Sequence, residues 1–201
     1  MGLDISIGII DEEKWYQKID EEKIDTMKFE LSRQFCNLQC RQNVVTHETE
    51  MKQIGKLAQI DIILIEQMSW YLRDREMEDQ LFFYDSEEEK EKFKEKVKNT
   101  NEQVMGNLVK VKNTVKTLIS KLSQIDDLPS KLINTDFDTM NNERYFSKFN
   151  ENLGDGYIGN NFGQDLRNLL KLIEFAESLG EDTVFFEYGS RKKTEKYILR
   201  F

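Results

Sequence analysis

Alternation of apolar and polar residues marks strands near both ends of the chain. Residues 3–9 place leucine or isoleucine at every second position, the period that directs one row of side chains toward a core. Near the other end, 183–188 and 194–201 have the composition of strands joined by a turn at 189–191, as in a hairpin. We therefore expect a small sheet in which 3–10 joins the C-terminal hairpin.

Between these ends, apolar residues recur at the three- and four-residue spacing of amphipathic helices. The pattern predicts helices over 11–41 with an uncertain break, over 46–72, and from residue 160 or 161 to 179, closed by Gly180. The apolar stripe of the second helix is wide enough for a central element packed on two sides. Residues 81–84, Leu-Phe-Phe-Tyr, fit either a short strand or an apolar anchor that folds the connection back on the core.

The clearest periodicity lies in residues 86–125. Ser86 followed by three glutamates is a strong helix start. The apolar residues that follow keep the alternating spacing of a heptad, with Asn101 in the seam: Val97, Val104, Leu108, Val111, Val115, Leu118, Leu122 and Ile125. A helix of about forty residues would extend roughly 60 Å, which is long for a domain of this size. Either Gly106 breaks this helix, or it projects as an elaboration of the domain.

The composition agrees with a helical fold. A chain of 201 residues is long enough for one domain, which we expect to span 1–201. Its single proline favours long uninterrupted helices. The predicted fold class is α+β, mostly α, with long antiparallel helices and a small sheet built from the N-terminal strand and a C-terminal hairpin.

Charge is distributed unevenly. The net charge of −9 does not favour general attraction to a nucleic-acid backbone, although local basic patches could contact phosphate at close range. Residues 11–30 carry eight acids against four lysines and could bind a basic groove, or could simply be a solvated helix face. Two basic segments supply the candidate partner-binding residues: Lys110, Lys112, Lys116, Lys121, Arg191, Lys192 and Lys193.

One glycine motif invites a nucleotide-binding interpretation. Gly154, Gly156 and Gly159 spell G-x-G-x-x-G ahead of a helix, and Glu187 could supply the acid that holds a ribose. However, 142–153 does not have the pattern of a buried parallel strand, and the chain lacks repeated βαβ units. We interpret the glycines as a tight connection and expect no cofactor.

Metal sites and membrane segments are also not indicated. Cys36 and Cys40 suit one face of a helix in a reducing, cytoplasmic compartment, and with His47 they offer at most three ligands at no familiar zinc spacing. The segment 134–145 resembles a calcium loop but has threonine and tyrosine where that loop requires glycine and glutamate. The longest apolar run, 62–65, is too short to cross a bilayer, and the start has no cationic leader.

Both ends of the chain resemble one group of proteins. The opening MGLDI resembles the start of small uncharacterised phage and prophage proteins, and GYIG at 156–159, the helix to residue 179 and TVFFEYG at 183–189 resemble their end. The resemblance covers about a third of the chain. It implies a mobile-element origin and an accessory role, such as blocking a host defence nuclease.

We therefore predict a non-enzymatic protein-binding accessory protein, a phage-borne inhibitor of a CRISPR-type nuclease or ribonucleoprotein. Two alternatives stay open. One is a nucleotide-binding enzyme that uses the glycine loop 154–159. The other is a structural protein that assembles as a coiled-coil homodimer through the seam 97–125.

Overall fold

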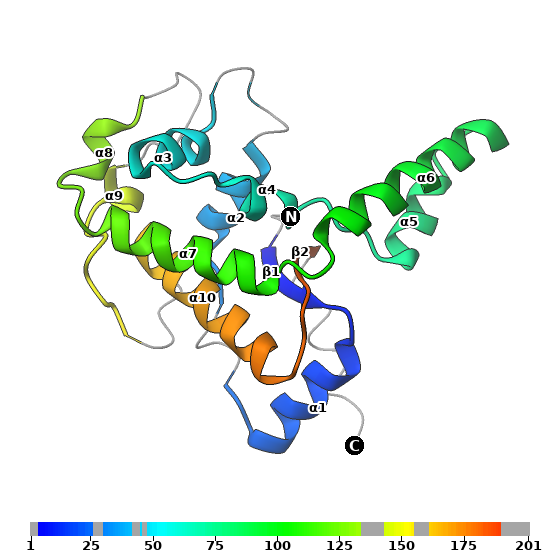
Figure 1. Cartoon of the computed structure of the whole chain (residues 1–201), viewed down its shortest axis with the longest axis horizontal. Helices are drawn as coiled ribbons and strands as arrows, with labels where there is room; N and C mark the ends of the chain where they lie inside the picture. Colours follow the sequence, from blue (N-terminus) through cyan, green and yellow to red (C-terminus); the bar gives the residue numbers. More distant parts are fainter. Residues whose placement is uncertain are drawn as a thin grey trace.

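The computed structural model describes residues 4–25, 30–41, 45, 48–133, 143–154 and 161–189 (Figure 1). These residues form a mostly helical α+β fold, as the sequence predicts. In chain order the elements are β1 (Asp4–Ile9), α1 (Glu12–Glu22), α2 (Arg33–Cys40), α3 (Glu50–Ala58), α4 (Ile63–Gln67), α5 (Asp74–Leu81), α6 (Glu87–Val104), α7 (Leu108–Leu122), α8 (Leu128–Lys131), α9 (Glu143–Phe146), α10 (Phe162–Ser178) and β2 (Val184–Gly189).

The two strands come from opposite ends of the chain and pair antiparallel. Asp4 lies opposite Gly189, and Ile9 lies opposite Val184. The isoleucines at alternate positions of β1 are buried, which confirms the period-two pattern. The partner strand expected over 194–201, and the turn that would lead to it, lie outside the described residues.

Two long helices, α7 and α10, form the centre of the core and lie side by side (Figure 1). Each presents an apolar stripe with almost no exposed surface: Leu108, Val111, Val115, Leu118 and Leu122 on α7, and Leu166, Leu169, Ile173 and Ala176 on α10. Helices α3 and α4 also pack on α7. The C-terminal half of the heptad seam is therefore occupied by other elements of the same chain.

Gly106 divides the heptad segment into two helices. Its φ is +68°, a left-handed conformation that costs glycine little and other residues more. The next residue is held by β2, because the Asn107 side-chain amide donates to the Val184 carbonyl at 2.8 Å and accepts from the Val184 N–H at 2.9 Å. Residues 86–125 therefore do not form one continuous helix. Helix α7 enters the core and α6 points away from it (Figure 1).

The helix predicted over 46–72 is wrong, because the chain turns at Gln59. This residue adopts a φ of 55°, and its N–H bonds back to the last turn of α3. The Asp61 side chain then accepts the N–H of Ile63 at 2.9 Å and starts α4. Apolar residues on both sides of the turn face the same core, so the sequence stripe continues although the helix does not.

The prediction for 11–41 is partly confirmed and that for 160–179 is confirmed. Helix α1 ends at Glu22 and is capped by Lys23, which has a φ of 50°, and α2 begins only after Ser32, whose hydroxyl accepts the Phe35 N–H. Helix α10 begins at the predicted cap Asn161 and is followed by Gly180 with a φ of +77°. Among the described helices, none has both the length and the hydropathy needed to cross a bilayer.

Candidate interaction surface

A helical hairpin projects from the rest of the protein (Figure 1). It consists of α5, the turn 82–86 and α6, and we call residues 74–104 the arm and the other described residues the body. Helix α5 packs along α6. At the far end of the arm the rings of Tyr84 and Phe93 stack with centroids 5.0 Å apart, and Val97 is buried nearer the base. The arm is therefore a packed hairpin with a small apolar seam of its own.

The base of the arm is fixed to the body by side-chain contacts with backbone atoms. The Asn101 amide donates to the Leu72 carbonyl at 2.8 Å and accepts the Leu72 N–H at 3.0 Å. Arg73, at the N-cap of α5, donates to the Ile9 carbonyl at 2.7 Å and forms an ion pair with Glu187 at 2.7 Å. Leu72 and Arg73 directly precede the arm, so these contacts fix the point at which the arm leaves the body, beside both strands.

Glu187 of β2 is the ion-pair partner of Arg73 at the base of the arm. Burial raises the pKa of its carboxyl, and the neighbouring Arg73 partly opposes that rise. The Arg73 guanidinium also lies over the ring of Phe185 in β2, 4.8 Å from the ring centroid. The acid that the nucleotide-binding alternative requires is therefore engaged in a half-buried ion pair with Arg73.

The turn of the arm exposes two large aromatic side chains. Phe82 is 89% exposed and Phe83 is 81% exposed, and their rings meet edge to face with centroids 6.0 Å apart. Backbone hydrogen bonds from Phe83 to Gln80 and from Tyr84 to Leu81 continue the last turn of α5. Both interpretations of residues 81–84 are wrong: they form no strand, and Tyr84 packs on Phe93 of the arm itself and not on the core of the body. Pairs of such rings left in water are unusual away from interaction sites.

Most of the net negative charge of the chain lies in α5, the turn and the start of α6. Residues 74–91 contain nine acidic and two basic residues, a net charge of −7 against −9 for the whole protein. The next seven residues, 92–98, contain four lysines and one glutamate. Residues 74–91 are therefore strongly acidic, and the sign of the charge reverses within α6, after Glu91.

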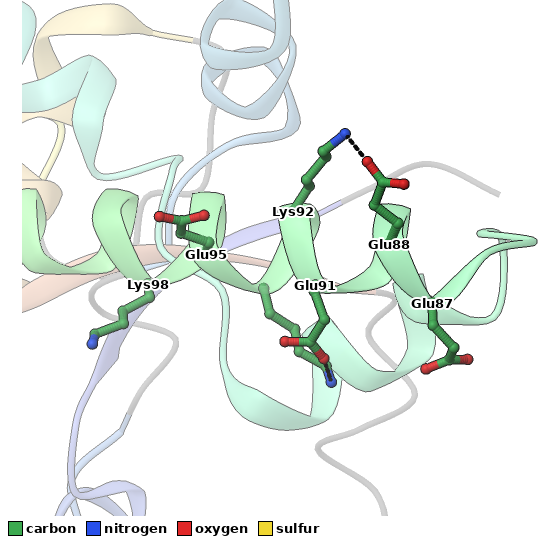
Figure 2. Close-up of a pocket in the computed structure, with 7 residues that line it drawn as sticks. Glu87, Glu88, Glu91, Lys92, Glu95 and Lys98 are labelled. Atoms are coloured by element: carbon green, nitrogen blue, oxygen red, sulfur yellow. Dashed lines mark hydrogen bonds and ion pairs between the residues drawn. The ribbon is translucent and has the colours of Figure 1, made fainter.

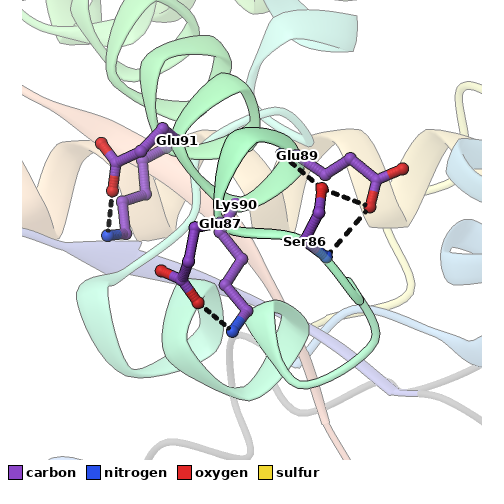
Figure 3. A network of polar contacts seen from close by, with 6 residues as sticks. Ser86, Glu87, Glu89, Lys90 and Glu91 are labelled. Carbon is purple, nitrogen blue, oxygen red and sulfur yellow. Dashed lines mark hydrogen bonds and ion pairs between the residues drawn. The ribbon is translucent and has the colours of Figure 1, made fainter.

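Ion pairs on α6 join residues three or four positions apart, which are neighbours on the surface of a helix. Glu88 pairs with Lys92 at 2.6 Å, as Figure 2 shows, and Glu87 pairs with Lys90 at 2.7 Å (Figure 3). The hydrogen bond from Lys90 lowers the pKa of the Glu87 carboxyl. These groups are largely exposed, so such pairs contribute little to stability. They leave the excess of carboxylates in residues 74–91 uncompensated.

The first turn of α6 is closed by a capping box (Figure 3). The Glu89 N–H donates to the Ser86 hydroxyl at 3.2 Å, and the Ser86 N–H donates to the Glu89 carboxylate at 3.3 Å. Within the described part of the chain, Glu78, Asp79 and Asp85 form no ion pair. The exposed rings thus lie between a capped helix start and unpaired carboxylates.

The hollow drawn in Figure 2 is not a substrate cleft. It is lined by α6 alone: Glu87, Glu88, Glu91, Lys92, Lys94, Glu95 and Lys98. A binding cleft needs walls from at least two elements to remove a ligand from water, and a single helix is convex. The charged face of α6 is a surface and not a pocket.

The predicted basic residues do not form one free patch. Lys112 pairs with Glu177 and Lys116 pairs with Glu174 at 2.8 Å, so both bridge α7 to α10. Lys110 and Lys121 are exposed, and neither forms an ion pair with another described residue. The three other candidates, Arg191, Lys192 and Lys193, lie outside the described residues.

The described part of the glycine stretch has no strand leading into it. Residues 143–153 form α9 and turns. The Gly154 N–H donates to the Asn152 side chain at 3.0 Å, and Gly156 and Gly159 lie outside the described residues. Gly163 has a packing role, since a Cβ there would lie 2.3 Å from the Phe149 carbonyl oxygen.

Cys36 and Cys40 share one face of α2, as their spacing predicts. Cys36 is buried and Cys40 is half-buried. The hydrogen bond between the thiols raises the pKa of Cys36 and lowers that of Cys40 to about 7. His47 lies outside the described residues, and within those ranges no three histidine, cysteine or acidic side chains converge as metal ligands would.

A buried carboxyl links three elements of the body. Asp165 on α10 is 2% exposed, and its carboxyl accepts the Ser32 N–H at 2.8 Å, the Ser32 hydroxyl at 2.5 Å and the Tyr145 hydroxyl at 2.9 Å. Burial raises the pKa of Asp165 to about 7 against the effect of these hydrogen bonds. These contacts join α10 to the start of α2 and to α9, so the carboxyl forms a junction of three helices.

Comparison with models of known protein families, with curated proteins and with solved structures gives no match.

Proposed function

We propose that the protein is a non-enzymatic interaction protein that docks on a larger partner protein through its arm. The observation that carries the proposal is the pair Phe82 and Phe83, which are exposed at the turn of a projecting hairpin. Aromatic residues dominate the binding energy of protein interfaces. Burying one such side chain contributes about 1.5–3 kcal/mol.

The construction of the arm supports this role. Its base is fixed to the body by Asn101 and Arg73, and its turn is held by the stack of Tyr84 on Phe93. A surface that is already ordered loses less conformational entropy when it binds. The arm can therefore present its two rings to a partner without first folding.

The identity of the partner is proposed from the sequence resemblance alone. A phage-borne inhibitor would dock on a defence nuclease or its ribonucleoprotein. A projecting acidic arm is compatible with either, because both kinds of assembly carry basic surfaces that bind phosphate.

The test is site-specific crosslinking in the organism that encodes the protein. Benzoylphenylalanine is placed at position 83 on the arm or, as a control, at position 109, where Val109 is 56% exposed on the body helix α7. The proposal expects light-dependent crosslinks to a discrete protein from position 83 and none from position 109. Crosslinking that is equal at the two positions, or absent at 83, rejects the arm as the docking element.

A further inference from the structure

The chemistry of the arm also limits what can cover it. We infer that the arm tip, defined as Phe82, Phe83, Glu78, Asp79 and Asp85, binds a cationic amphipathic protein surface, in which an apolar patch is rimmed by lysine and arginine. This inference rests on the proposed function and adds the chemical class of the partner.

Phe82 and Phe83 give the arm tip its apolar character. Both are more than four-fifths exposed, and they contact each other edge to face. Their exposure is not a consequence of an unpacked turn, because the adjacent Tyr84 is stacked on Phe93 and the following helix is capped by Ser86. A partner must therefore supply an apolar patch that receives two adjacent rings.

The negative charge of the arm disfavours nucleic acid, an anionic membrane and a second arm as the occupant of the tip. Residues 74–91 carry a net charge of −7, which repels the phosphates of nucleic acid and the anionic headgroups of a membrane. The same charge opposes pairing of two arm tips from two copies of the chain. A cationic protein surface gains from both the rings and the carboxylates.

The carboxylates also lie where they would contact the rim of such a patch. Glu78 and Asp79 precede the rings by three to four residues and Asp85 follows them by two. Charges beyond about 8 Å are largely screened at physiological salt, so these nearest groups dominate the attraction. On α6 the tip is followed by four lysines at 92–98, and these disfavour contact of a basic rim with that stretch of the helix.

The inference is tested with the full chain and synthetic peptides, by fluorescence anisotropy. The probe is a labelled amphipathic helix of leucine and lysine, about 18 residues or five turns long. One control peptide replaces leucine by serine at the same charge, and another replaces lysine by glutamate. The wild type should bind the leucine–lysine peptide about tenfold more tightly than either control, and raising the salt from about 50 to about 300 mM should weaken binding markedly.

Matched variants of the protein locate the binding. Phe82→Ser with Phe83→Ser should weaken binding about tenfold or more, whereas Val109→Ser, a change of another exposed apolar residue, should leave it unchanged. Glu78→Gln with Asp79→Asn and Asp85→Asn should weaken binding and reduce its salt dependence. All of these residues are exposed, so circular dichroism should show that every variant folds.

The outcomes separate this inference from the proposed function. Crosslinks from position 83 without any preference for the leucine–lysine peptide would reject the cationic partner and keep the arm as a docking element. Equal binding by the Phe82 and Phe83 variant would reject the tip. Light scattering that shows a dimer lost on the same double substitution would assign the tip to a second copy and would also overturn the inference.

Discussion

Replacing Asp165 by asparagine should change how the stability of the protein depends on pH. The carboxyl is buried and joins the start of α2, the helix α9 and the helix α10 through Ser32 and Tyr145. Asparagine has the same shape as the protonated acid, and both neighbouring hydroxyls can rotate to accept its N–H groups. The substitution therefore removes the titration and keeps the junction.

The size and direction of the effect follow from the pKa of Asp165, which is raised from 3.8 to about 7. Below about pH 4 the carboxyl is protonated in both the folded and the unfolded state. Between about pH 4 and pH 7 the unfolded chain loses this proton while the folded protein keeps it, so the free energy of unfolding falls as the pH rises. A difference of about three pKa units corresponds to at most about 4 kcal/mol. Tyr145 stays protonated throughout, because burial raises the pKa of its hydroxyl well above the ordinary value.

Urea unfolding of the wild type and Asp165→Asn between about pH 4.5 and pH 7.5 measures this contribution. The difference in free energy of unfolding, wild type minus variant, should decrease steadily as the pH rises. Tyr145→Phe is the control, because it keeps the carboxyl and removes one hydrogen bond to its charged form. It should retain the slope and extend it to higher pH. A difference that is constant with pH, or that grows, would refute the assignment of a raised pKa to Asp165.

Three further substitutions test other contacts. Glu50→Gln leaves Arg41 without its buried carboxylate 2.6 Å away and should cost about 3–5 kcal/mol of stability in urea unfolding, much of it recovered when both residues become methionine. Gly163→Ala places a methyl group 2.3 Å from a backbone carbonyl oxygen and should lower the free energy of unfolding by about 1–3 kcal/mol. Gly189→Ala is its control, because a Cβ there meets no atom within 4 Å, and it should be nearly neutral. Thermal melts of both variants measure the difference. Asn101→Ala removes two hydrogen bonds at the arm base and should speed hydrogen exchange in residues 72–104 while leaving α7 and α10 protected.

The sheet and the helix α10 could be predicted because local signals and burial agree there. In β1 every second residue is apolar and faces the core. In α10 the cap, the stripe and the closing glycine all lie at the expected positions. Where caps, periodicity and packing agree in this way, sequence alone indicates an element correctly.

The turn between α3 and α4 could not be predicted for a physical reason. Gln59 has no sequence signal for a left-handed conformation, and the apolar spacing continues on both sides of it. The chain can turn there because Ile60 donates its N–H to the Gly55 carbonyl at 2.9 Å, and because Gly55 leaves room for Ile62. The turn at Gln59 is therefore determined by tertiary contacts, which the periodicity of apolar residues does not reveal.

For the same reason, the sequence predicts the heptad spacing of residues 86–125 but not that the first half of this segment forms part of a projecting arm. Both halves of 86–125 keep heptad spacing, but the described structure buries five apolar residues of α7 and only Val97 and Val104 of α6. The charged residues that crowd α6 cannot enter a core without partners, so Gly106 separates a half that the core can bury from a half that it cannot. Heptad spacing alone predicts that a helix packs against another element, but it does not identify that element. Apolar density and charge together decide whether the contact lies inside the chain, and for α6 they leave the arm in solvent with Phe82 and Phe83 at its end.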